Sequence, residues 1–389
     1  MRPPEPFVSG REVAAAELVD RTQELSELTA VMRGGGRHFL IGPRRFGKTS
    51  LLTVAAGRVR ELGDVVVQVN AERFATESAV ATELVRQATT QFGPTFKRTL
   101  ADATAAFSRL RPQFSYDAIK EAWSVKLTID APETRATIIA EALDGLDELA
   151  RVRDRRIAVL LDEFPALVRP GGIVAERQLR AVVQTHRHLS YVFAGSDESM
   201  MIAMTSDHAR PFYRLGSRRF LGPIPRDDFR DHISEAFRRS GIDILPAAGE
   251  EILSLAEDVP YSVQRLSKLC WQAARAITRP LPIDTDFVGE RLDDFLRVEA
   301  PIYAQFLSQL TPNQLLVLKD LADGIARGGE SKQARARRLG LGASTLQRSE
   351  EALVKKSFTR RVYDGDPKIR YAFEDPFFRR FVQSEVVLQ

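Results

Sequence analysis

The sequence has 389 residues, of which 44% are hydrophobic and 28% charged, so it is long enough for two or three domains and has the composition of a globular protein. No stretch approaches the roughly 18 consecutive apolar residues of a membrane-spanning helix, and residues 1–6 lack the apolar core of a secretion signal. The single cysteine, Cys270, excludes an internal disulfide framework and is expected to be buried, while a net charge of only +4 confines any basic surface to part of the chain. We therefore expect a cytoplasmic protein without a membrane partner.

The chain is expected to begin with a flexible or loosely docked arm, residues 1–16, because Pro3, Pro4 and Pro6 disfavour regular structure. A helix is predicted at residues 22–32, and the three glycines at 34–36 end it. The apolar run 37–41 that follows is typical of a short buried strand.

Residues 42–49 read G-P-R-R-F-G-K-T, which matches the phosphate-binding loop G-x-x-x-x-G-K-[ST] between a strand and a predicted helix at 50–60. The backbone N–H groups at the start of a helix bind phosphate oxygens, and glycine permits a close approach. The pattern predicts ATP as ligand, with Lys48 on the phosphates and solvated when they are absent, and with Thr49 on Mg²⁺. The alternative, a glycine-rich turn with an unrelated lysine, does not explain both flanks. The predicted nucleotide contacts are Gly42, Pro43, Arg44, Arg45, Phe46, Gly47, Lys48, Thr49 and Ser50.

A second strand is predicted at 64–70, with helices at 76–92, 96–107 and 133–152 and a hairpin or irregular insertion at 116–129. The apolar run 157–161 then ends in Asp162 and Glu163. Because ligands bind at the carboxyl ends of parallel strands, we assign Asp162 to Mg²⁺ and Glu163 to the attacking water. The alternative is an ordinary acidic turn or helix start.

Further helix and strand signals at 175–188, 190–195 and 219–225 complete an α/β pattern that predicts a doubly wound parallel sheet. Ser196 follows one of these strands, and we expect it to hydrogen-bond the γ-phosphate or the water as a catalytic group, to cap the next helix, or to do both. Arg214, with Arg218 and Arg219, is a candidate phosphate sensor or finger into a neighbouring subunit; the alternative is solvated surface charge.

After residue 225 the strand signals stop, and helices are predicted at 226–240, 246–257, 260–277 and 284–309. Residues 311–389 then predict three helices, with the turn 340–342 between the last two, and a hairpin at 358–363 and 368–373. This order is typical of a winged helix-turn-helix.

Residues 311–389 carry 15 Lys and Arg against 10 Asp and Glu, so the positive charge of the chain lies here. Basic residues of this kind neutralise DNA phosphates. Glu350 and Glu351, on the predicted recognition helix, favour a protein partner instead. The candidate DNA contacts are Arg348, Arg360, Arg361, Lys368 and Arg370.

Several segments occur together in a familiar order: the phosphate loop, V-L-L-D-E-F at 159–164, A-G-S at 194–196, D-V-P-Y-S-V-Q-R-L at 258–266 and D-P-F-F-R-R-F at 375–381. With them the chain resembles the archaeal-type ATPase family, among the AAA+-like signal-transduction (STAND) ATPases related to origin-binding initiators.

The resemblance implies an ATPase core at 17–225, a helical lid at 226–310 and a winged helix at 311–389. It implies that Lys48 and Thr49 bind phosphate and Mg²⁺, that Asp162 and Glu163 are the metal-binding and catalytic acids, and that Pro260 lies near the adenine. Residues 18–21 match a box that often reads F-V-G-R, but Asp20 replaces the glycine. The lid arginine of initiator-type relatives is not at Pro260, and Arg265 follows one turn later.

Taken together, the sequence predicts an ATP-binding switch that hydrolyses ATP slowly and controls a winged helix contacting double-stranded DNA. The alternative is a signalling or defence scaffold whose winged helix contacts a protein partner. A homo-oligomer is compatible with both.

Overall fold

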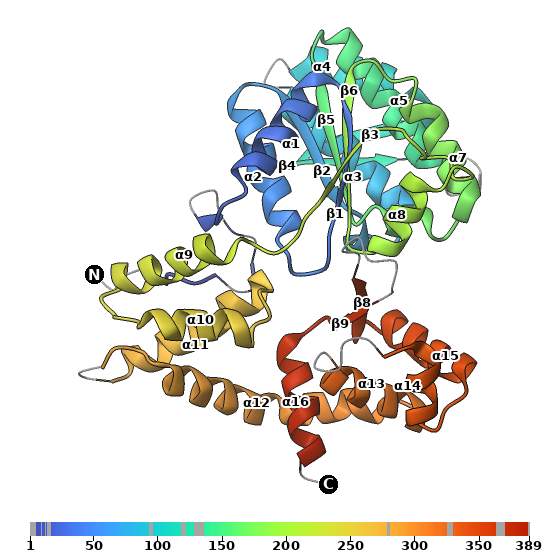
Figure 1. The fold of residues 1–389 in the computed structure, drawn as a ribbon. Helices are drawn as coiled ribbons and strands as arrows, with labels where there is room; N and C mark the ends of the chain where they lie inside the picture. Colours follow the sequence, from blue (N-terminus) through green and yellow to red (C-terminus); the bar gives the residue numbers. More distant parts are fainter. Residues whose placement is uncertain are drawn as a thin grey trace. The chain divides into compact units, whose positions relative to one another are not determined.

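The computed structural model describes residues 5–8, 10–11, 13, 17–92, 96–117, 122–127, 136–277, 281–324, 330–362 and 370–387. The chain forms two compact units (Figure 1). The core unit consists of residues 12–43 and 47–222, and the C-terminal unit consists of residues 1–11, 44–46 and 223–389. Among the described residues, no helix has the length and apolar character needed to cross a membrane.

A five-stranded parallel sheet forms the centre of the core unit, which confirms the predicted fold class. Its strands occur in the order β2-β5-β6-β1-β7. β5 therefore lies between β2, which comes much earlier in the chain, and β6, which is the next strand along it. The strands are β1 (Arg37–Ile41), β2 (Val65–Asn70), β5 (Ile157–Asp162), β6 (Leu189–Gly195) and β7 (Ser217–Phe220).

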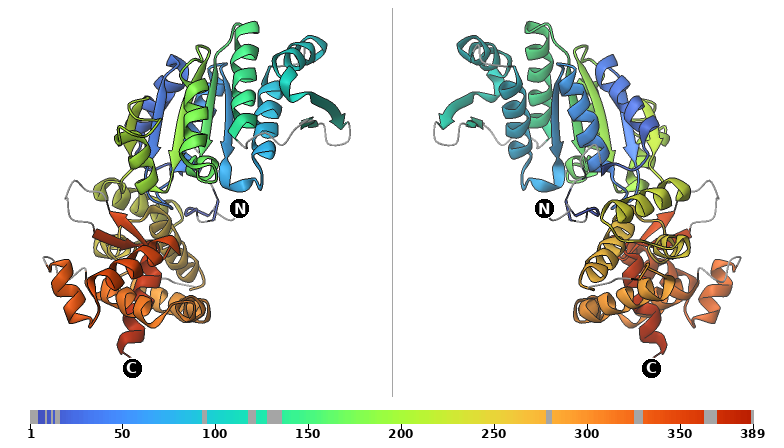
Figure 2. Two further views of the ribbon diagram at one scale, coloured as in Figure 1. Left: turned by 90° about the vertical axis from the view of Figure 1, so that its right-hand side faces the viewer. Right: turned by 90° about the vertical axis from the view of Figure 1, so that its left-hand side faces the viewer.

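Helices cover both faces of this sheet (Figure 2). One face, with Val67 and Phe193 among its side chains, packs into a single apolar cluster with residues of α3, α5, α7 and α8. Helices α1 and α2 lie on the other face. The bounds are α1 (Thr22–Gly34), α2 (Lys48–Glu61), α3 (Glu77–Gln91), α5 (Ala136–Val152), α6 (Pro165–Val168), α7 (Gly172–Val183) and α8 (Glu198–Ser206).

The insertion predicted near residues 116–129 is a hairpin that follows α4 (Phe96–Ala106). Its strands are β3 (Pro112–Asp117) and β4 (Ala122–Leu127). Phe114, Val125 and Leu127 pack against the core cluster, and Ser115 and Ser124 on the other face are exposed.

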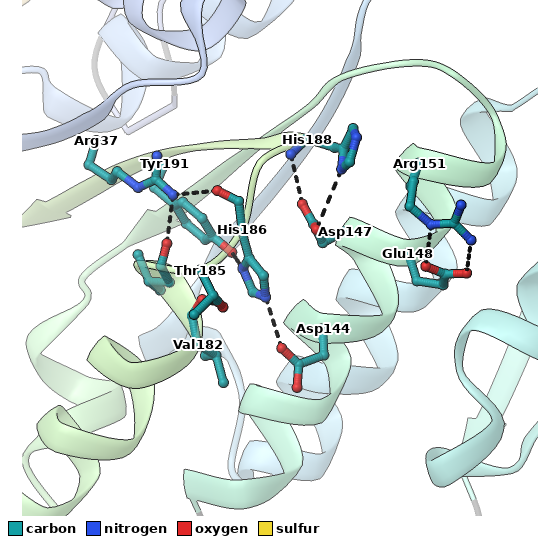
Figure 3. A network of polar contacts seen from close by, with 11 residues as sticks. Arg37, Asp144, Asp147, Glu148, Arg151, Val182, Thr185, His186, His188 and Tyr191 are labelled. Atoms are coloured by element: carbon teal, nitrogen blue, oxygen red, sulfur yellow. Dashed lines mark hydrogen bonds and ion pairs between the residues drawn. The ribbon is translucent and has the colours of Figure 1, made fainter.

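A polar network lies at the edge of the sheet where the strands begin (Figure 3). The predicted helix 175–188 ends earlier, at Val183, and Arg37 donates hydrogen bonds to the carbonyl oxygens of Val183 and His186, both at 2.7 Å. The His186 ring lies between Tyr191 Oη, at 2.5 Å, and Asp144 Oδ1, at 2.8 Å. These bonds fix the turn into β6 and explain the early helix end.

In the described part of the chain after residue 223, four helices are followed by three more and a hairpin, close to the predicted pattern. The final helix, α16, was not predicted. Its Phe378 and Phe381 pack with Tyr303 of α12 in one apolar cluster, so α13 to α16 share a core with α12. The bounds are α9 (Arg226–Arg239), α10 (Pro246–Leu255), α11 (Pro260–Arg275), α12 (Thr285–Ser308), α13 (Pro312–Gly324), α14 (Lys332–Arg338), α15 (Ala343–Lys355), β8 (Thr359–Val362), β9 (Arg370–Phe373) and α16 (Pro376–Val387).

Residues 5–8 of the predicted N-terminal arm are packed within the C-terminal unit. Phe7 is 1% exposed and its ring centroid lies 4.7 Å from that of Phe237. The N–H group of Val8 donates to Gln264 Oε1 at 3.1 Å. The expectation of loose docking is therefore wrong for this segment, because a buried aromatic ring outweighs the local effect of the prolines.

Candidate functional site

The phosphate loop and both acids lie at the edge of the sheet where the parallel strands end. β1 leads into the loop and α2 begins at Lys48, β5 ends at Asp162, and Ser196 follows β6 directly. Since β5, β6 and β1 are consecutive in the sheet, their carboxyl ends meet there.

The two loop glycines meet different physical demands. A Cβ atom on Gly42 would lie 2.7 Å from the Leu221 carbonyl oxygen, so glycine is needed for packing against the segment after β7. Gly47 has φ of +86° and immediately precedes α2, a conformation that favours glycine. The loop therefore presents the N-terminus of a 14-residue helix, an arrangement suited to an anion.

Lys48 is buried, with 5% of its surface exposed. Its Nζ donates to the carbonyl oxygens of Gly42 and Pro43, at 2.8 and 2.9 Å. The expectation of a solvated lysine is therefore wrong: the loop curls around the ammonium group, and its own carbonyls satisfy it. The same geometry holds the charge at the centre of the loop.

Asp162 is fully buried and accepts hydrogen bonds on both carboxylate oxygens. Thr49 Oγ1 and Asn70 Nδ2 donate to Oδ2, at 2.7 and 3.1 Å, and the N–H group of Glu163 donates to Oδ1 at 3.0 Å. Burial raises the pKa of Asp162, an effect that the Thr49 hydrogen bond opposes. Hydroxyl and carboxylate oxygens in direct contact are the hard donors that Mg²⁺ prefers, so these residues fit the predicted ion.

Glu163 is held by Ser196. Both the N–H group and the hydroxyl of Ser196 donate to Glu163 Oε2, at 3.0 and 2.8 Å. Glu163 has φ of +49°, an uncommon conformation for a side chain other than glycine. The helix-cap alternative for Ser196 is wrong, because Asp197 caps α8 by accepting from the N–H group of Met200.

Asn70 is the polar residue that sequence reasoning missed. It ends the buried strand β2, which neighbours β5, and its amide contacts Asp162. A polar side chain ending an apolar strand was the available signal. Strand order, which places Asn70 opposite Asp162, was not known from the sequence.

The remaining predicted nucleotide contacts have different environments. Arg44 and Arg45 are exposed and Phe46 is buried. Within the C-terminal unit, to which residues 44–46 belong, Arg45 forms an ion pair with Asp375 at 3.0 Å. Ser50 accepts a hydrogen bond from the N–H group of Val13 at 3.2 Å, and Pro260 is buried at the first position of α11.

The candidate sensor arginines near the last strand contact other residues of the same chain. Arg214 lies 5.1 Å from the ring centroid of Tyr213, Arg218 donates to Ser206, and Arg219 pairs with Glu27. A sensor role for Arg214 stays a prediction. In α11, Arg265 pairs with Glu299 at 3.1 Å and lies 4.2 Å from the ring centroid of Phe295.

The basic residues of α14, α15 and the hairpin β8–β9 divide into two groups. Arg335 pairs with Asp320 and, at 2.6 Å, with the buried Glu350; Arg338 pairs with Asp320 and Glu330. Glu350 therefore does not lie on the exposed face of α15, so of the two acids that favoured a protein partner, Glu350 is buried and Glu351 is exposed. The other group lies at the surface: Arg337, Arg348, Lys355 and Arg370 are exposed, and Arg360 and Arg361 are half-buried. Arg360 lies 5.3 Å from the ring centroid of Phe46, and Lys368 lies outside the described residues.

Comparison with solved structures identifies the same fold in other proteins. The Walker-type ATPase of Pyrococcus abyssi aligns with a TM-score of 0.61 and 15% identity, over 97% of this chain and 99% of that protein. The Aeropyrum pernix ORC2 protein, solved in ADPNP–ADP complexes, aligns with a TM-score of 0.55 and 15% identity, over 98% and 97%. No curated protein matches in sequence.

The sequence profile of one family, described as an ATPase domain predominantly from Archaea, matches residues 18–252. This match spans the phosphate loop, both acids and Ser196, together with α9 and most of α10. The chain therefore belongs to this family of ATPase domains, predominantly from Archaea.

Proposed function

We propose that this ATPase requires Mg²⁺ and acts as a slow molecular switch whose nucleotide state controls a DNA-contacting winged helix. One observation carries the enzymatic part: Thr49 of the phosphate loop lies 2.7 Å from Asp162 at the end of β5. This contact places the two predicted Mg²⁺ residues together although 113 positions separate them. Bound there, the ion would neutralise charge on the β and γ phosphates.

Lys48 and the start of α2 would bind the triphosphate. The Lys48 ammonium group already lies within the loop, where it donates to two carbonyl oxygens. Charged phosphate oxygens are stronger acceptors than neutral carbonyls, so they would compete for these N–H donors. The Aeropyrum pernix ORC2 complexes support the expectation that this fold accepts adenine nucleotides.

Glu163 would align the attacking water and accept its proton. Its carboxylate follows the metal-binding acid directly, and Ser196 holds it through one oxygen, Oε2. The other oxygen, Oε1, takes no part in these two bonds and is the atom we assign to the water. A positioned base of this kind typically contributes about 10²–10⁴-fold to the rate.

The test of the enzymatic part is phosphate release by the purified full chain with ATP and Mg²⁺, repeated with a chelator. We expect slow turnover that stops when the metal is removed. ATP binding without turnover under any metal condition would contradict the assignment of Glu163 and reduce the function to nucleotide binding.

Exposed cations support the DNA part of the proposal. Arg348 lies exposed on α15, the helix that follows the turn. Its Nε donates a long hydrogen bond, 3.4 Å, to the Ser344 carbonyl oxygen. In a winged helix-turn-helix this is the helix that enters the major groove. Arg360, Arg361 and Arg370 on the hairpin would contact phosphates.

Duplex binding should be measured on the full chain with ATP, with ADP and without nucleotide. A fragment beginning at residue 311 would remove Tyr303 and Leu307 from the shared apolar cluster, so it is unsuitable. Arg348→Ala should alter sequence preference, whereas Arg360→Glu with Arg361→Glu should weaken all duplexes and flatten the salt dependence. Arg238→Ala, which removes a 72% exposed arginine of α9, is the matched control.

The alternative, a scaffold whose winged helix contacts protein, makes the opposite forecast. It is favoured by the exposed Glu351, which lies on α15 together with Arg348. Absence of duplex binding in every nucleotide state at about 50 mM salt, where electrostatic binding is strong, would support the scaffold and reject the DNA proposal.

A further inference from the structure

The tip of the phosphate loop is the part of that motif which belongs to the C-terminal unit. Residues 44–46 pack within this unit, whereas residues 42–43 and 47–49 belong to the core unit. At the tip, Phe46 is 6% exposed, and the guanidinium carbon of Arg360 lies 5.3 Å from its ring centroid. The shape of the tip therefore depends on residues far from the motif in sequence.

Arg45, in the middle of this tip, has an unfavourable backbone conformation. Its φ is +68°, in the left-handed region that residues with a side chain rarely adopt. Gly47, two positions later, also has a positive φ, but as a glycine it adopts this conformation without strain. An arginine in the left-handed region persists only when surrounding contacts hold it there.

Tyr261 and Asp375 supply these contacts. The N–H group of Tyr261 donates to the Arg45 carbonyl oxygen at 3.3 Å; Tyr261 is the second residue of α11, where N–H groups have no acceptor within the helix. The Arg45 guanidinium group lies 5.0 Å from the Tyr261 ring centroid and pairs with Asp375 Oδ2 at 3.0 Å. Both the backbone and the side chain of Arg45 are therefore held within the C-terminal unit.

Asp375 opens the segment D-P-F-F-R-R-F, and its carboxylate has a fixed position. The second oxygen, Oδ1, accepts from the N–H group of Phe377 at 2.9 Å and so caps the start of α16. Arg379, one turn later, pairs with Glu257 just before α11 at 2.5 Å. One carboxylate thus joins the start of α16 to the tip of the phosphate loop.

We propose that Asp375 and Tyr261 are positioning residues of the nucleotide site: by holding Arg45 in the left-handed conformation, they keep the loop in the shape that accepts ATP. The inference rests on the proposed ATP binding by this loop. It goes further, because it gives the last segment of the chain a role in nucleotide affinity that is separate from DNA contact. The apparent dissociation constant rises as the fraction of molecules with the competent loop shape falls.

Asp375→Asn tests the ion pair. Asparagine keeps an oxygen that can cap α16 but removes the charge that attracts Arg45. By calorimetry we expect ATP affinity to fall about 3- to 5-fold, the scale of a partly exposed ion pair. The single-turnover rate at saturating ATP should remain as in the wild type, because bound phosphates then hold the loop. Asp323→Asn makes the same chemical change at an exposed position of α13 and should leave ATP affinity unchanged. Unchanged affinity in a folded Asp375→Asn variant would overturn the inference.

The decisive measurement repeats the change in an Arg45→Gly background. Glycine adopts a positive φ without strain, so the loop no longer needs to be held. Asp375→Asn should then cause no further loss of ATP affinity. Tyr261→Leu, which removes the ring but keeps the N–H group, should weaken ATP binding about 2- to 5-fold, and again only when Arg45 is present. Equal losses in both backgrounds would show that Asp375 and Tyr261 act only through their own helices, which would overturn the inference.

The reverse effect is measurable at α16. Because coupling between two sites is reciprocal, ATP should slow hydrogen exchange of the backbone amides at the start of α16 in the wild type but not in Arg45→Gly. Exchange that ATP leaves unchanged in the wild type would contradict the inference, while ATP binding itself would still support the proposed function. A folded wild type that does not bind ATP would reject both.

Discussion

Asp162 in the core unit and Glu350 in the C-terminal unit are both buried, but the partners of these two acids differ. In the core, Asp162 is held by the neutral donors of Thr49 and Asn70. In the C-terminal unit, Glu350 is 3% exposed and pairs with the guanidinium group of Arg335. Burial raises the pKa of both acids; a hydrogen bond from a hydroxyl opposes it at Asp162, and the charge of Arg335 opposes it at Glu350.

The difference separates a binding site from a structural contact. Neutral donors orient a carboxylate and leave its negative charge available to a cation. An arginine neutralises the charge and joins two helices, here α14 and α15. Sequence alone presents an acid in both cases, so the partner decides whether the acid can serve a ligand.

The largest effect on stability is expected from Arg335→Met in the C-terminal unit. The change leaves Glu350 buried without its cation and removes one of the two arginines on Asp320, so the free energy of unfolding should fall by about 3 kcal/mol. Chemical denaturation measures it. Arg337→Met, on the exposed side of the same helix, is the control and should change stability by less than about 0.5 kcal/mol. Equal effects of the two variants on stability would show that the Arg335–Glu350 ion pair has no structural role.

The next effect is expected on the rate, in the core. Glu163→Gln keeps the shape of the side chain and its contact with Ser196 but removes the base, so turnover should fall at least ~10²-fold while ATP affinity is retained. Single-turnover hydrolysis and calorimetry check this. A wild-type rate in Glu163→Gln would mean that Glu163 has only a structural role, as Glu350 does. It would contradict the contrast between the acids of the site and Glu350.

A smaller effect is expected from Lys48→Met, which removes the cation but keeps much of the apolar stem. Loss of a charge-assisted contact should weaken ATP binding about 10- to 100-fold. Because Gly42 and Pro43 lose their donor, stability must be measured as well, by thermal unfolding without nucleotide. Unchanged ATP affinity in a folded variant would reject the phosphate-loop assignment.

The smallest effect is expected at Asp20, an exposed residue of the core unit. Its backbone conformation, rather than its charge, is unfavourable. Its φ is +51°, in the left-handed region that favours glycine. The F-V-G-R box that residues 18–21 resemble has glycine at this position. Asp20→Gly should therefore raise stability by about 0.5 kcal/mol, and Asp20→Val should lower it by about 1 kcal/mol. Denaturation midpoints in the reverse order would show that the Asp20 side chain makes a necessary contact.

The phosphate loop and the acid pair were predictable because each is a contiguous motif. Glycine spacing, the lysine and the apolar run before Asp162 are local properties, and the fold class follows from the alternation of strand and helix signals. The final helix α16 was missed, because its aromatic residues are buried against Tyr303, more than seventy positions earlier, and this long-range packing is not visible in the local sequence.

What the sequence determined by itself was therefore the chemistry available: a phosphate loop, a hydroxyl for a metal, two adjacent carboxylates and a basic C-terminal region. Only the tertiary structure decided which groups meet. Asn70 contacts Asp162 across 92 positions and Ser196 contacts Glu163 across 33, because β2 and β6 flank β5 in the sheet. Hydrogen bonds between residues at the ends of neighbouring strands depend on the order of the strands in the sheet. The packing of α14 against α15 buries Glu350 beside Arg335 and leaves Arg348 exposed. Neither is a property of a short stretch of sequence.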